Sequence, residues 1–76
     1  MIGIFLDANV LFTAAHNPKG KAALVITLGH EGIFKLATSA YAREEARRNI
    51  VRKFPEGLPE LTRLLVPIRI VPDNLS

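Results

Sequence analysis

Residues 2–7, Ile2-Gly3-Ile4-Phe5-Leu6-Asp7, set the fold class that we expect for this chain. A run of apolar residues without polar alternation is typical of a strand that is covered on both faces in a parallel sheet. The run ends abruptly at an acid. Ligands of such sheets bind beyond the carboxyl ends of the strands, so Asp7 stands where a functional residue is expected.

The rest of the chain predicts further helices and strands in alternation. The expected helices cover residues 10–12, 19–31, 40–53 and 58–65, and the expected strands cover 33–36 and 66–71. Asn9 and Ser39 are suited to cap the first and third helices, while Gly32 and Pro55 end the second and third. This order implies an α/β layer structure with right-handed crossovers, in which Asp7 and Ser39 share one rim.

Length and composition limit the architecture and the location. With 76 residues, 49% of them hydrophobic and 22% charged, the chain is one unit that suits a piece of a larger core or an associating subunit. It has no cysteine, which excludes disulfides and thiolate metal sites. No apolar run is long enough for a membrane span and no signal peptide is evident, so we expect a cytoplasmic protein without membrane contact.

Basic residues are concentrated in one segment. Five of the ten Lys and Arg residues lie within residues 43–53, and the formal net charge is +3. They are Arg43, Arg47, Arg48, Arg52 and Lys53. A basic helix can neutralise the phosphates of a nucleic acid, although an ordinary solvated helix face has the same composition.

The apolar stripe of the helix expected over 40–53 separates two neighbouring acids. At about 100° per residue, the stripe consists of Ala42, Ala46, Ile50 and Phe54. Glu45 borders this stripe and can face the strand ends. Glu44 points to the far side, where it can pair with Arg47 or Arg48.

Asp7 and Glu45 are the candidate metal ligands. A carboxylate directly after a buried strand loses hydration, which a hard cation such as Mg²⁺ can offset. For Asp7 the alternative is a cap of the following turn. For Glu45 alone a surface salt bridge is the simpler interpretation, and only its pairing with Asp7 makes it a second candidate ligand.

Two motifs resemble those of the PIN-domain ribonucleases. Residues 4–11, Ile4-Phe5-Leu6-Asp7-Ala8-Asn9-Val10-Leu11, are similar to the opening of that family, in which a hydrophobic strand ends in Asp and Thr, Ser or Asn follows two residues later. Residues 38–45, Thr38-Ser39-Ala40-Tyr41-Ala42-Arg43-Glu44-Glu45, resemble its second motif, a Thr/Ser-Ser pair with an acid six positions after the Ser. Six positions after Ser39 is Glu45.

The resemblance implies a fold and an activity. The fold is a three-layer PIN-like arrangement, with a partial parallel sheet flanked by helices. Asp7 and Glu45 would bind Mg²⁺ or Mn²⁺, and Asn9 and Ser39 would orient them or the substrate. A metal-activated water would then cut single-stranded RNA. Many family members are toxins that form homodimers and are inhibited by an antitoxin protein.

The resemblance covers only the N-terminal part of the family. Its further acids belong to a region that would follow Ser76, and Asp73 suits a turn better than a metal site. We therefore expect residues 1–76 to form a single truncated PIN-like domain of weak or no activity.

Other interpretations stay open. One is a non-catalytic half-domain that binds RNA or associates with itself. A second is a haloacid-dehalogenase-like phosphotransferase, although Asn9 stands where that family needs its second Asp. His16 and His30 form no spaced pair, which argues against zinc. We expect His30 to compensate a helix dipole, and Tyr41 to pack beside Ala42 rather than stack on a base.

Overall fold

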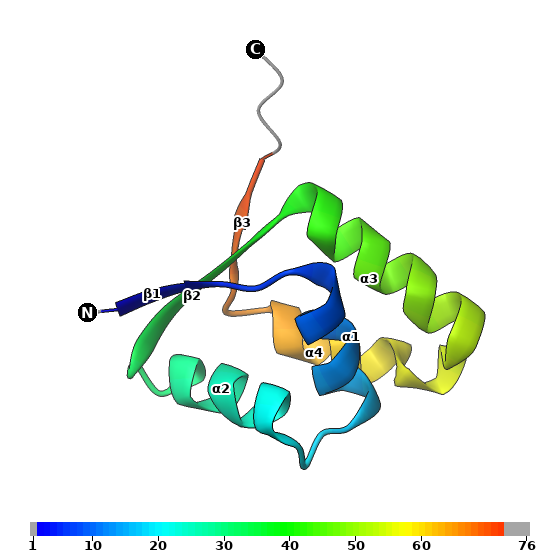
Figure 1. The fold of residues 1–76 in the computed structure, drawn as a ribbon, viewed down its shortest axis with the longest axis horizontal. Helices are drawn as coiled ribbons and strands as arrows, with labels where there is room; N and C mark the ends of the chain where they lie inside the picture. Colours follow the sequence, from blue (N-terminus) through cyan, green and yellow to red (C-terminus); the bar gives the residue numbers. More distant parts are fainter. Residues whose placement is uncertain (1, 73–76) are drawn as a thin grey trace.

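Strands and helices alternate along the chain, as Figure 1 shows for the computed structural model, which describes residues 2–72. The elements are β1 (Ile2–Phe5), α1 (Ala8–His16), α2 (Lys21–His30), β2 (Phe34–Ser39), α3 (Ala40–Lys53), η1 (Pro55–Gly57), α4 (Leu58–Leu65) and β3 (Arg69–Val71). The predicted α/β class is confirmed, with three parallel strands and four α-helices in the described part. Asp73, predicted to lie in a turn, is outside the described residues.

The three strands form one sheet in the order β1-β2-β3. Both pairings are parallel, with Ile4 opposite Leu36 and Ala37 opposite Arg69. Each crossover between neighbouring strands therefore runs through a pair of helices, as the sequence order requires. No helix within residues 2–72 is long and apolar enough to cross a membrane.

Helix α1 is longer than predicted and has a different cap. It begins at Ala8, and the Asp7 side chain accepts a hydrogen bond from the Val10 backbone N–H at 3.0 Å. The prediction that Asn9 caps this helix is wrong, because Asn9 lies within its first turn. An Asp directly after the strand reaches the free N–H groups first.

Two glycines set the position of α2 against the sheet. Gly32 has a φ of 91°, a left-handed conformation that suits glycine and turns the chain from α2 toward β2, as predicted. A Cβ on Gly29 would overlap the Leu36 side chain. Only a residue without a side chain lets α2 approach β2 so closely.

Strand β3 is shorter than predicted, because residues 66–68 form a turn. The Val66 N–H donates to the Arg63 carbonyl and the Ile68 N–H to the Leu65 carbonyl. These bonds extend the end of α4. The strand therefore begins at Arg69 rather than at residue 66.

A single hydrophobic core joins the sheet to the helices. Its fully buried members include Leu6, Leu11, Ile26, Ile50, Leu61 and Leu64. The predicted stripe of α3 is buried at Ala42, Ala46 and Ile50, and Phe54 packs against the core. Among residues 2–72 one polar side chain is buried: the Thr38 hydroxyl donates to the Leu6 carbonyl at 2.6 Å. This bond joins the ends of β1 and β2.

The expectation that β1 is covered on both faces is wrong for the described structure. Phe5 remains 60% exposed. Lys35 and Arg69, which point to the same side of the sheet as Phe5, are also exposed. The apolar run indicates a strand correctly, but the core of residues 2–72 packs against the side that carries Leu6 and Leu36.

Candidate metal and nucleic-acid site

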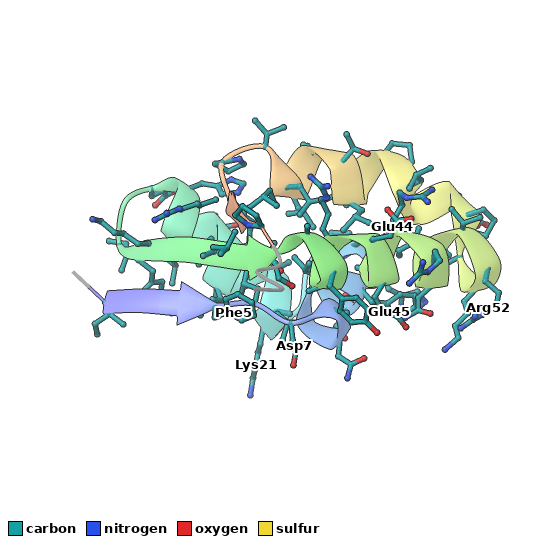
Figure 2. All side chains as sticks on the ribbon, turned by 90° about the horizontal axis from the view of Figure 1, so that it is seen from above. Phe5, Asp7, Lys21, Glu44, Glu45 and Arg52 are labelled. Atoms are coloured by element: carbon teal, nitrogen blue, oxygen red, sulfur yellow. The ribbon has the colours of Figure 1, made fainter. Side chains whose placement is uncertain are left out.

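A hollow of about 400 Å³ lies at the carboxyl ends of β1 and β2. Its wall contains the four residues singled out in the sequence, Asp7, Asn9, Ser39 and Glu45. They come from two segments about thirty residues apart, which the parallel pairing of β1 with β2 brings together. Figure 2 shows Asp7 and Glu45 on the same side of the molecule.

Asp7 is the cap of α1, which is one of the two roles that the sequence left open. One carboxylate oxygen, Oδ1, caps α1 by accepting from Val10. Within residues 2–72 the other oxygen accepts no hydrogen bond, and the side chain is exposed at the hollow. A cap that uses one oxygen leaves the second available to a cation.

Ser39 is confirmed as the cap of α3. Its Oγ accepts a hydrogen bond from the Ala42 N–H at 2.9 Å. Because the hydroxyl hydrogen is not used in this contact, Ser39 can still donate into the hollow. Asn9 is exposed in the first turn of α1 and adds an amide oxygen and nitrogen to the same wall.

Glu45 forms an ion pair at the edge of the hollow. Its carboxylate lies 3.0 Å from the Arg48 guanidinium, and the two side chains are 38% and 54% exposed. Ion pairs this exposed contribute at most about 1 kcal/mol. The pair is therefore weak enough for a cation to displace Arg48 from Glu45.

Glu44 makes the equivalent contact away from the hollow. It pairs with Arg47, and Figure 2 places it on the opposite side of α3 from Glu45. The hydrogen bond from Arg47 lowers the pKa of the Glu44 carboxyl below its ordinary value. The two neighbouring acids are separated as the helical periodicity predicts.

The five basic residues do not form one surface. Helical spacing puts Arg48 and Arg52 on the side of Glu45, three and seven residues further along α3. Arg43 and Arg47 point away from that side, and the Lys53 ammonium lies over the Phe12 ring, 5.9 Å from its centroid. Only part of the predicted basic cluster therefore flanks the hollow.

The donors in the hollow match a hard divalent cation in kind. Two carboxylates, an amide and a hydroxyl offer the oxygen ligands that Mg²⁺ and Mn²⁺ prefer, with water completing the shell. Within residues 2–72 no group of three or more His, Cys, Asp or Glu side chains gathers at one place. In the described part of the chain the hollow is lined by two carboxylates, those of Asp7 and Glu45.

The expectation for Tyr41 is wrong, and the packing of His16 was not predicted. Tyr41 does not pack beside Ala42: it is 63% exposed and lines the hollow. His16 stacks on Phe12 at a centroid distance of 5.7 Å and meets the Phe54 ring edge at 4.8 Å. The spacing of Phe12 and His16 by four residues was the available signal for their stacking. His30 lies in the last turn of α2, as predicted.

Comparisons with protein-family models, with curated proteins and with solved structures found no match for this chain. The PIN-domain resemblance therefore stays a prediction from the two motifs.

Proposed function

We propose that this chain carries part of the divalent-metal site of a PIN-like endoribonuclease that cuts single-stranded RNA. The observation that supports the proposal most is the common hollow of Asp7, Asn9, Ser39 and Glu45. Two motifs that are separate in the sequence supply its polar wall. Oxygen donors gathered beyond parallel strands are what a metal-dependent hydrolase of this class requires.

In the proposed site Asp7 and Glu45 bind Mg²⁺ or Mn²⁺. The bound ion supplies a nucleophilic water at neutral pH and offsets the charge of the phosphodiester. Ser39 donates toward a carboxylate or a phosphate oxygen, and Asn9 orients the neighbouring group. Since Glu45 pairs with Arg48 before the ion binds, the ion would free Arg48 to contact a phosphate.

The proposal includes features beyond the described residues. A three-layer PIN-like fold has helices on both sides of the sheet, and its metal site contains a further carboxylate. A continuing chain or a second copy would supply both. A homo-oligomer, an antitoxin partner and a cytoplasmic location belong to the same proposal.

Metal binding is the direct test, because it does not require a complete active site. We expect Mn²⁺ affinity, measured by electron paramagnetic resonance, to fall at least about tenfold in Asp7→Asn and Glu45→Gln. Asn keeps the helix cap, so Asp7→Asn leaves α1 intact. Glu44→Gln is the matched control, since it removes an equally paired acid on the other side of α3.

Cleavage of a labelled single-stranded RNA is the second measurement. Any metal-dependent cleavage should be lost in Asp7→Asn and Glu45→Gln and kept in Glu44→Gln. Equal Mn²⁺ affinity in all four proteins would contradict the proposed site, and so would cleavage that persists in both variants.

A non-catalytic RNA-binding half-domain is the second candidate function. It is favoured by the presence of only two charged ligands within residues 2–72, with Arg48 and Arg52 on the same side of α3. RNA binding that survives both acid substitutions and weakens steeply with salt, without cleavage, would favour this alternative.

A further inference from the structure

Two aromatic rings at the hollow are exposed in a way that the metal site does not explain. Phe5 and Tyr41 both line the hollow, and they are 60% and 63% exposed. The other aromatic side chains, Phe12, Phe34 and Phe54, pack against the core. Exposed rings are thus concentrated at the candidate site.

The backbone holds both rings away from the core. Phe5 precedes Leu6 in an extended segment, and neighbouring side chains of such a segment point to opposite sides. Leu6 is only 2% exposed, so Phe5 must face outward. Tyr41 precedes Ala42, which is buried at the start of α3. Neither ring can enter the core without removing a buried neighbour.

Positive charge lies on either side of the rings. Lys21 and Phe5 share a second groove beside β1, and Figure 2 shows Lys21 extending on the side where Asp7 lies. In the other direction Figure 2 shows Glu45 and then Arg52 further along α3. Flat apolar rings with cations nearby match a ligand that has flat faces and phosphates, as a single strand of nucleic acid does.

We infer that Phe5 and Tyr41 form a stacking subsite for an unpaired RNA base next to the metal ligands. The inference rests on the proposed function, because it assigns residues to the substrate of that site. Phosphates of the same strand then contact Arg48 and Arg52 along α3. Stacking on aromatic rings tolerates any base, so this subsite selects single strands without selecting a sequence.

Tyr41 itself is the reporter for the test. It is the sole tyrosine and the chain has no tryptophan, so tyrosine emission comes from this position alone. We would titrate the protein with a short single-stranded oligoribonucleotide in EDTA, which prevents metal-dependent cleavage. We expect the emission of Tyr41 to be quenched as the RNA binds.

The variants separate stacking from charge. Tyr41→Ala and Phe5→Ala should each lower RNA affinity about tenfold or more, measured by anisotropy of labelled RNA. Tyr41→Phe keeps the ring and should stay within about threefold of the unmodified chain. Leu24→Ala, which removes an exposed apolar side chain of α2, is the control. Circular dichroism establishes that each variant is folded.

Three results would overturn the inference. One is RNA binding without quenching and with equal affinity in both alanine variants. Another is an affinity for inorganic polyphosphate as high as that for RNA, which would mean that the protein recognises charge alone. The third is an effect of Phe5→Ala on self-association, measured by sedimentation, with no effect on RNA. Because the titration contains no metal, its failure is distinct from a failure of the metal site.

Discussion

Glu44 and Glu45 are neighbours with the same local chemistry and different surroundings. Each belongs to α3, each pairs with an Arg three residues further on, and their side chains are 42% and 38% exposed. Yet Glu45 lines the hollow that contains Asp7, whereas Glu44 lies on the opposite side of the helix. The difference teaches that the rotation of α3 about its axis, and not the ion pair, selects the candidate ligand.

That rotation is fixed by buried side chains. Ala46 and Ile50 are fully buried, and Ala42 is 6% exposed. Turning α3 so that Glu44 faced the hollow would expose this stripe and bury charged neighbours, at a cost of several kcal/mol. The core therefore decides which acid can meet Asp7.

The largest effect is expected from Ile50→Ala. Removing most of a fully buried side chain should lower the free energy of unfolding by about 2–5 kcal/mol, measured by urea denaturation. Val51→Ala is the control, because Val51 is 46% exposed on the next position of α3 and should cost less than about 1 kcal/mol. Equal losses in the two variants would mean that the stripe does not anchor the helix.

A smaller loss is expected from Thr38→Val. The variant leaves the buried Leu6 carbonyl without its donor, which should cost about 1–3 kcal/mol. Because Leu6 precedes Asp7, the Mn²⁺ affinity should fall as well. The ion pair of Glu44 with Arg47, on the other side of α3, should be unaffected.

Thr62→Val is the matched control for that loss. The Thr62 hydroxyl also donates to a backbone carbonyl, but it is exposed and bonds within its own helix, to Leu58. We expect Thr62→Val to lower the free energy of unfolding by less than about 0.5 kcal/mol. A loss at Thr62 as large as that at Thr38 would remove the argument that the buried bond positions Asp7.

A modest effect on metal affinity is expected from Arg48→Gln. Removing the cation that competes for Glu45 should tighten Mn²⁺ binding about two- to fivefold, as expected for an exposed ion pair. Arg47→Gln changes the equivalent pair on the other side and should leave Mn²⁺ affinity unchanged. If both variants bind Mn²⁺ alike, the two sides of α3 are electrostatically equivalent.

The smallest effect concerns the pH dependence of the Glu44 pair. Since the hydrogen bond from Arg47 lowers the folded-state pKa of Glu44, the pair stabilises the fold above the ordinary pKa of glutamate. This contribution is lost as the pH falls through the lowered pKa. Arg47→Gln should raise the pKa of Glu44 toward its ordinary value in an NMR titration. An unchanged pKa would show that the contact does not persist in solution.

Much of the fold was predictable from local patterns. The apolar run before Asp7, the stripe of α3 and the Ser39 cap each depend on residues close in sequence, which periodicity describes well. The convergence of Asp7 with Glu45 was predictable for a related reason. Parallel strands place their carboxyl ends at one edge, and two motifs mark those ends.

The errors arose where distant parts of the chain decide the outcome. The exposure of Phe5 depends on which side of the sheet the helices cover, and a continuous apolar run does not specify that side. Tyr41 is exposed because it lines the hollow, which is formed by segments that are distant in the sequence. The division of the basic residues required knowing which acids and rings lie near each of them, as with Lys53 over Phe12.

The contact of His16 with two phenylalanine rings has a consequence for the geometry of the hollow. His16 ends α1 and Phe54 follows α3, so the rings join the carboxyl ends of these two helices. Their amino ends are joined through the paired strands that precede them. Contacts at both ends of the two helices resist their separation, and they therefore constrain the spacing between Asp7 and Glu45.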